Sequence, residues 1–178
     1  MSLSNALRST FIQRAESAGA RVHPVEPHSA ALHSLLEGIV GDQSLLASPM
    51  PFNEPWVFEC VRQLPQLTLD PDESQLAAGL TGITDVFAGV AETGSIALSN
   101  AATLAGPLSL FTSRHIALLD VRKLVARPRE LFERPEWQEL IMNMVFITGP
   151  SATADMGKLV RGVHGPGSLD IILIGEPA

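Results

Sequence analysis

The sequence is poor in the residues that several classes of function require. It has one cysteine, Cys60, among 178 residues. A single thiol excludes an intrachain disulfide, and it excludes a zinc or iron–sulfur site built from cysteines of this chain alone. We therefore expect a reducing, cytoplasmic setting. The N-terminal stretch lacks a basic segment followed by a long apolar core, so we expect no secretory signal.

Positive charge is also scarce. The chain has 12 Lys and Arg against 19 Asp and Glu, a formal net charge of −7, and no basic cluster stands out. Binding to nucleic acid or to an anionic membrane surface requires a basic face. The charge balance therefore predicts neither kind of partner.

Long apolar runs are missing too, although 46% of the residues are apolar. The stretch from Thr93 to Ser113 carries no formal charge and is long enough to span a bilayer. Its apolar residues come in short bursts between hydroxyl, amide, glycine and proline residues. This pattern predicts a buried strand and a loop, and no membrane span.

Helical and strand-like patterns alternate along the chain. Apolar stripes at helical spacing run from Leu3 to Ala18 and through residues 28–40, and a helix interrupted at Pro135 is expected over residues 127–141. Two more helices are predicted with Asn53 and Asp70 as N-caps, each close to a proline. Runs typical of strands occupy residues 20–25, 44–48, 85–91, 95–99, 115–120, 144–148 and 169–175.

This alternation predicts an α/β fold of three layers with a largely parallel sheet. The runs 85–91 and 95–99 are too close for a crossover, so we expect them to pair as an inserted β-hairpin. The length suits a single domain over residues 1–178. Within it, residues 1–79 are mostly helical and residues 80–175 carry the α/β part with the motifs described below.

Polar residues follow several of the predicted strands, where α/β sheets bind ligands. They are Glu92, Ser99 with Asn100, Asp120 and Thr148. Glu92 is a lone carboxylate between two apolar strands, and burial would raise its pKa and suit it to act as a general base or nucleophile. Alternatively, it is a turn residue that accepts hydrogen bonds from the amides of Thr93 and Gly94. The residues themselves leave both readings open.

The segment "TGPSATAD", residues 148–155, follows a predicted strand and is typical of a helix start. Backbone amides at such a start, with the hydroxyls of Thr148, Ser151 and Thr153, could hold a phosphate or carboxylate. The alternative is an ordinary strand–helix turn capped by Ser151. The segment matches neither the Walker pattern nor GxGxxG.

The histidines offer one further candidate. His164, between glycines in "GVHGPGS", could reach into a cleft as a proton donor, or could belong to a plain turn before the last strand. His115 opens a strand and is either a core or a site-facing residue. His28 and His33 are five residues apart, a spacing that does not favour a metal pair on one helix face.

Three ordered blocks resemble the LUD-domain family, in particular the lactate-utilisation protein C (LutC-like) group. They are Ala91-Glu92-Thr93-Gly94, Thr148-Gly149-Pro150-Ser151 with Thr153-Ala154-Asp155, and Val163-His164-Gly165-Pro166. The resemblance covers roughly residues 80–175. It implies a fold similar to the NagB/RpiA/CoA-transferase group and a role in oxidising L-lactate to pyruvate beside iron–sulfur partner subunits. The clusters would lie on those partners, since this chain has too few cysteines and is expected to hold no cofactor of its own.

The resemblance makes Glu92 and His164 the catalytic candidates. The ligand-binding candidates are Thr93, Gly94, Thr148, Gly149, Ser151, Thr153, Asp155 and Gly165. We expect them to border one cleft that binds a small carboxylate, a phosphate-bearing group or a partner segment, and we expect no metal site. The family usually follows Thr-Ala-Asp with a hydrophobic residue and a glutamate. This chain has Met156-Gly157, so a contact made by that glutamate in relatives is lost or changed.

Two functions of different classes follow. The first is an accessory protein for L-lactate oxidation. The alternative is a stand-alone enzyme of transferase or isomerase type, in which Glu92 acts as nucleophile or base on a phosphorylated or CoA-linked substrate. A third reading, a binding or regulatory module, involves no chemistry, so the sequence leaves open whether the chain is an enzyme.

Overall fold

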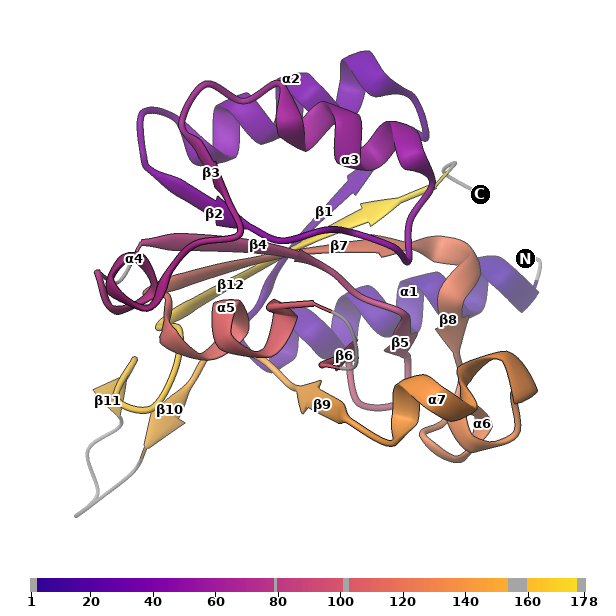
Figure 1. Cartoon of the computed structure of the whole chain (residues 1–178). Helices are drawn as coiled ribbons and strands as arrows, with labels where there is room; N and C mark the ends of the chain where they lie inside the picture. The colour runs from indigo at the N-terminus through magenta and orange to yellow at the C-terminus, as the bar shows by residue number, and fades with distance from the viewer. Residues whose placement is uncertain (1–2, 79, 101–102, 154–159, 176–178) are drawn as a thin grey trace.

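The computed structural model describes residues 3–78, 80–100, 103–153 and 160–175. Its centre is a six-stranded sheet in the order β1-β12-β7-β4-β2-β3, in which every neighbouring pair is parallel (Figure 1). The strands are β1 (Arg21–Val25), β2 (Leu45–Ala47), β3 (Leu67–Leu69), β4 (Thr81–Asp85), β7 (Arg114–Asp120) and β12 (Ser168–Ile174). The predicted three-layer α/β fold with a largely parallel sheet is confirmed.

Helices cover one face of this sheet. They are α2 (Ser29–Val40) and α3 (Pro55–Arg62), with the short α4 (Glu73–Ala77) near one end (Figure 1). Leu32 and Leu36 of α2 and Val57 of α3 pack with Ile116 of β7 and Ile172 of β12 in one apolar core. The apolar runs of β7 and β12 are buried on both faces because a second layer covers the other side.

That second layer combines α1 (Leu3–Ser17), α5 (Ala105–Phe111) and a four-stranded sheet (Figure 1). The sheet has the order β8-β5-β6-β9, with β8 (Leu124–Val125), β5 (Ala88–Val90), β6 (Ser95–Ser99) and β9 (Met144–Ile147). Strands β5 and β6 pair antiparallel, so the predicted hairpin is present, and it belongs to this second sheet. Phe11 of α1 and Ile96 of β6 pack with Ile171 of β12 in a second apolar core.

Shorter elements complete the chain. They are η1 (Val121–Lys123), α6 (Arg129–Phe132), η2 (Pro135–Trp137), α7 (Gln138–Ile141), β10 (Ala152–Thr153) and β11 (Val160–Arg161). Trp137 and Leu131 pack on Phe87 and Ala97 beside the hairpin. No helix in the described ranges is long and apolar enough to cross a membrane.

Several predicted boundaries are wrong. The predicted strand 85–91 is split, because Asp85 ends β4 and only Ala88–Val90 forms β5. Neither predicted N-cap is one: the cap of α3 is Glu54, while Asn53 donates its side-chain amide to the Leu118 carbonyl. The cap of α4 is Asp72, which forms a capping box with Gln75. The predicted loop before Ser113 contains helix α5.

Candidate functional site

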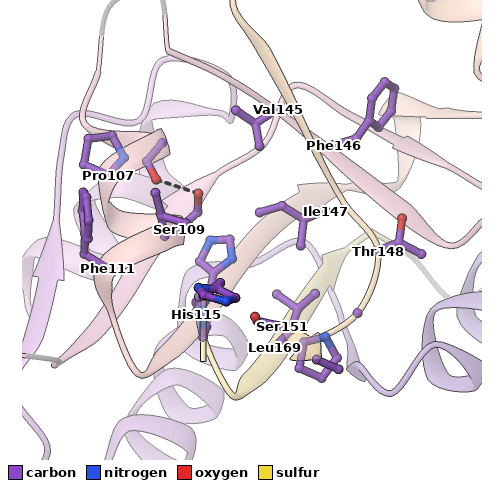
Figure 2. A pocket seen from close by; sticks show the side chains of 18 of the residues that line it. Pro107, Ser109, Phe111, His115, Val145, Phe146, Ile147, Thr148, Ser151 and Leu169 are labelled. Atoms are coloured by element: carbon purple, nitrogen blue, oxygen red, sulfur yellow. Dashed lines mark hydrogen bonds between the residues drawn. The ribbon is translucent and has the colours of Figure 1, made fainter. Parts of the chain in front are cut away.

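A cavity of about 770 Å³ lies between α5, β9 and the loops that follow β9 and β11 (Figure 2). Its floor includes His115 and Leu169, the second residues of β7 and β12, so it lies at the amino ends of these parallel strands. It is lined by Ala18, Asn100, Gly106, Pro107, Ser109, Leu110, Phe111, His115, Val145, Phe146, Ile147, Thr148, Gly149, Pro150, Ser151, Ala152, His164, Gly165, Pro166 and Leu169.

Five of the predicted site residues border this cavity. They are Thr148, Gly149, Ser151, His164 and Gly165. Two of the three sequence blocks therefore meet in space, and backbone hydrogen bonds hold them together. The Ser151 amide donates to the Pro166 carbonyl at 2.8 Å, and the Gly162 amide donates to the Ser151 carbonyl at 3.0 Å.

The predicted helix start in this segment is wrong. Ala152 and Thr153 form β10, which pairs antiparallel with β11, so Ser151 caps no helix. The amide of Ser151 is already bonded within the loop and is not offered to an anion. Thr153 does not line the cavity, and Asp155 lies outside the described residues.

Glu92 lies apart from this cavity. It is exposed in the turn between β5 and β6, and it borders a separate hollow of about 340 Å³ with Arg14 of α1 and Arg127. Its amide donates to the Ala126 carbonyl at 3.0 Å. The expectation of a dry carboxylate beside residues 148–151 and His164 is therefore wrong. The alternative turn reading also needs correction, because the Gly94 amide donates to the Val90 carbonyl.

Gly94 and Gly149, from the first two blocks, allow the backbone of α1 and of Ala18 directly after it to pack closely against them. Gly94 has a φ of +69°, and a Cβ there would lie 2.2 Å from the Ala15 nitrogen. Gly149 has a φ of +71°, and a Cβ there would lie 2.1 Å from the Ala18 oxygen. Both positions require glycine for two reasons: the positive φ and the lack of space for a Cβ atom. Gly94 and Gly149 thus have a structural role in this chain.

A chain of hydroxyl groups joins the same two blocks. Thr93 Oγ1 is 2.7 Å from Ser95 Oγ, which is 2.5 Å from Thr148 Oγ1 on the cavity wall. Thr93 and Gly94 do not themselves line the cavity. Thr93 is linked to the cavity residue Thr148 only through the hydroxyl of Ser95.

His115 is a cavity residue that the sequence reading left undecided between core and site. Its side chain is only 1% exposed, and its Nε2 lies 2.9 Å from Thr84 Oγ1. Its Nδ1 is buried and has no hydrogen-bond partner among the described residues. Burial lowers the pKa of His115 to about 4 against a weaker opposing effect of Asp170, so the ring is neutral near pH 7.

Two polar residues on the opposite wall complete the cavity. Ser109 of α5 donates its hydroxyl to the Gly106 carbonyl at 2.8 Å. The side chain of Asn100 covers the first turn of α5, because a Cβ on Gly106 would lie 2.1 Å from Asn100 Oδ1. Asn100 was singled out as a residue after a strand, but nothing in the sequence of α5 marked Ser109.

The cavity therefore combines neutral hydrogen-bonding groups with apolar surface. Leu110, Phe111 and Phe146 are 50%, 58% and 41% exposed at its edge. The described lining residues include no carboxylate, ammonium or guanidinium group. Within the described part of the chain, no group of three or more His, Cys, Asp or Glu side chains could hold a metal ion.

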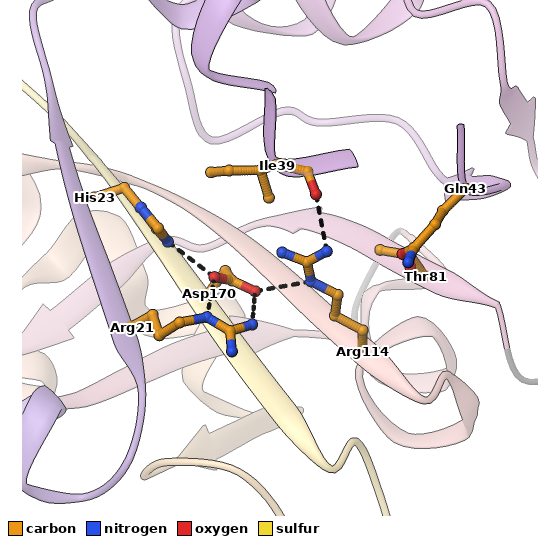
Figure 3. A network of polar contacts seen from close by, with 7 residues as sticks. All are labelled: Arg21, His23, Ile39, Gln43, Thr81, Arg114 and Asp170. Atoms are coloured by element: carbon orange, nitrogen blue, oxygen red, sulfur yellow. Dashed lines mark hydrogen bonds and ion pairs between the residues drawn. The ribbon is translucent and has the colours of Figure 1, made fainter. Parts of the chain in front are cut away.

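An ion-pair network centred on the buried Asp170 lies on the other face of the central sheet (Figure 3). Asp170 of β12 accepts hydrogen bonds from Arg21 at 2.8 and 2.7 Å, from Arg114 at 2.9 Å and from His23 at 2.8 Å. Burial acts to raise the pKa of Asp170, but these hydrogen bonds outweigh it and hold the pKa well below its usual range. The network ties β1, β12 and β7 together, and Arg114 also donates to the Ile39 carbonyl of α2.

The fold and the cavity define an α/β protein with a ligand-sized hollow between its central sheet and its second layer. The model of the LUD domain matches residues 9–174, and the chain belongs to this family. A similar solved structure is the 1.70 Å crystal structure of a DUF162 family protein from Deinococcus radiodurans. It superposes with a TM-score of 0.72 over 98% of this chain and 100% of that chain, at 19% identity, which shows a shared fold. No curated protein matches the sequence.

Proposed function

We propose that this LUD-domain protein is a LutC-like accessory protein in the oxidation of L-lactate to pyruvate, and that it acts with iron–sulfur partner subunits. The observation that carries the proposal is the convergence of two LutC-like blocks on one cavity. Residues 148–151 and 163–166 come from separate segments, yet the Ser151 amide bonds the Pro166 carbonyl and both segments face the same hollow.

The chemistry of the chain supports an accessory role over a self-contained redox role. Cys60 is the single cysteine, and it is buried against α2, with its Sγ 3.6 Å from the Ser29 carbonyl oxygen. It cannot anchor a cluster alone. Electron transfer would therefore take place on the partner subunits, with this chain supplying the cavity.

The alternative enzyme of transferase or isomerase type is not favoured by the geometry. That mechanism requires Glu92 beside the substrate in a site that shields it from water. Glu92 is exposed and borders a different hollow from residues 148–151.

Gene deletion tests the proposal. A deletion strain without any other lactate dehydrogenase should not grow on L-lactate as sole carbon source, and the wild-type gene should restore growth. Affinity-tagged protein from lactate-grown cells should co-purify with an iron–sulfur protein. Normal growth of the deletion strain would refute the proposal.

A pair of leucine variants tests the cavity within the same strain. Ser109→Leu places a larger side chain on the cavity wall, whereas Ser34→Leu makes the same change at an exposed position of α2. We expect the Ser34 variant to restore growth on lactate and the Ser109 variant to fail, with both proteins present at similar levels. Full growth with Ser109→Leu would show that the cavity is not needed.

A further inference from the structure

The buried ring of His115 is the most unusual polar group in the cavity. A buried nitrogen without a partner costs on the order of 1–3 kcal/mol, so such groups are rare in folded proteins. His115 Nδ1 is one of them, and the residue forms part of the cavity wall (Figure 2). A ligand in the cavity is the natural partner for this atom.

The bond to Thr84 indicates which group the ring offers. A neutral imidazole has one N–H donor and one acceptor nitrogen. In the described contacts, the Thr84 hydroxyl has His115 Nε2 as its only partner. The hydroxyl hydrogen is satisfied when Thr84 donates to Nε2, and this arrangement leaves the ring proton on Nδ1. A residue of the cavity floor therefore holds a buried donor that has no acceptor among the described residues.

The surroundings of this donor select against a charged acceptor. A buried carboxylate needs a cation or several strong donors nearby, and a neutral histidine supplies one hydrogen bond and no charge. The apolar side chains of Leu169 and Ile147 line the same floor and wall. A carbonyl oxygen on an uncharged molecule meets the donor without this penalty.

The size and edge of the cavity indicate the rest of the ligand. Its volume of about 770 Å³ falls within the roughly 300–1,000 Å³ of sites for small organic molecules. Leu110, Phe111 and Phe146 offer exposed apolar surface at the opening. An apolar ring system can cover these side chains, whereas lactate or pyruvate is too small to do so.

We propose that the cavity binds an uncharged ring compound of the quinone class, with one carbonyl oxygen accepting a hydrogen bond from His115 Nδ1. The inference rests on the proposed function in taking this cavity as the ligand site. Nδ1 is buried in this structure, so the carbonyl oxygen reaches it only when the cavity wall moves.

Calorimetric titration with two matched probes tests the proposal. Menadione is an uncharged naphthoquinone, and 2-methylnaphthalene has the same ring skeleton without the carbonyl groups. We expect menadione to bind roughly tenfold more tightly, which corresponds to one added hydrogen bond to a buried donor. Equal binding of the two probes, or no binding of menadione, overturns the proposal, and so does displacement of menadione by L-lactate.

Variants assign the difference to one residue. His115→Phe keeps a ring of similar size and removes the donor, so the two probes should bind it equally. His33→Phe makes the same change on α2, on the opposite face of the central sheet, and should keep the tenfold preference. If His115→Phe keeps the preference, the assignment to His115 is wrong.

Nuclear magnetic resonance of the wild-type protein decides the question even if His115→Phe does not fold. Menadione should move the Nδ1–H resonance of His115 further downfield than 2-methylnaphthalene does, because only menadione adds a hydrogen bond to the effect of its ring. An unmoved resonance in the menadione complex overturns the proposal. If menadione binds but deletion of the gene does not affect growth on lactate, the proposed function alone is refuted. If deletion abolishes growth on lactate but menadione does not bind, this inference alone is refuted.

Discussion

Asp85 should make the protein less stable as the pH rises from mildly acidic to neutral. The side chain ends β4 and is 1% exposed. Its Oδ2 accepts a hydrogen bond from the Phe52 amide at 2.6 Å, and its Oδ1 is buried with no partner in the part of the chain that the structure describes. Burial raises the pKa of Asp85 from 3.8 to about 6, more than the Phe52 amide and the charge of Lys123 lower it.

The direction and the size of the change in stability follow from this raised pKa. Below about pH 4 the carboxyl group is protonated in both the folded and the unfolded chain, and its favourable contribution to folding is fully present. This contribution is lost as the pH rises through about 6. A shift of about two units corresponds to about 3 kcal/mol in the free energy of unfolding.

The Asp85→Asn variant isolates this effect. The amide oxygen can still accept from the Phe52 amide, but it carries no charge at any pH. The free energy of unfolding of the variant minus that of the wild type should rise by about 3 kcal/mol between about pH 4 and about pH 8. Urea denaturation followed by circular dichroism across this range measures the difference.

A second carboxylate provides the control. The side-chain hydrogen bond from Ser74 and the Gln75 amide lower the pKa of Asp72, so the wild-type side chain favours folding once it is ionised. The free energy of unfolding of Asp72→Asn minus that of the wild type should therefore fall as the pH rises. A difference for Asp85→Asn that stays constant to within about 0.5 kcal/mol across this pH range would show that the pKa of Asp85 is not raised in the folded protein.

Two further stability predictions follow from the packing and the ion-pair network. Gly149→Ala should lower the free energy of unfolding by on the order of 2–4 kcal/mol, because the position has a positive φ and no space for Cβ, whereas Gly38→Ala on α2 should raise it by about 0.5–1 kcal/mol. Equal thermal shifts for the two glycine variants would contradict this. Asp170→Asn should cost about 3 kcal/mol because the fully buried carboxylate is the shared partner of Arg21, Arg114 and His23, whereas Arg21→Ala removes a side chain that is 55% exposed and should cost less than about 1 kcal/mol in urea titrations. A larger loss in the free energy of unfolding for Arg21→Ala than for Asp170→Asn would show that Arg21 contributes more to stability than Asp170.

Local patterns were sufficient to predict the layered fold. The apolar runs around Ile116 and Ile172 are long enough to be buried on both faces, so they predict covered parallel strands, and the structure has them as β7 and β12. The short connection at Thr93 and Gly94 permits only an antiparallel return, so the hairpin also followed from spacing. These features depend on residues close together in the sequence.

Some elements could not be predicted because distant contacts override local preference. Gly82 weakens the strand pattern of β4, yet it is required there, since a Cβ would lie 2.8 Å from the Leu108 carbonyl of α5. The segment after Gly149 has the composition of a helix start, but hydrogen bonds to the 162–167 loop hold it in an extended turn. Neither contact is visible in a local window.

For the site, the amino-acid sequence was enough to identify the blocks that contain Thr148, Ser151 and His164. It was also enough to rule out an iron–sulfur cluster bound by cysteines of this chain alone, because the chain has one cysteine. The folded chain was needed to see which residues share a cavity. An isolated charge in the sequence does not reveal on which side of a turn its side chain lies. The buried position expected for Glu92 was therefore wrong, and the structure places this residue on the surface. His115 became a candidate because the parallel pairing of β7 with β4 and β12 places it on a cavity floor beside Thr84, with one nitrogen that no described residue pairs.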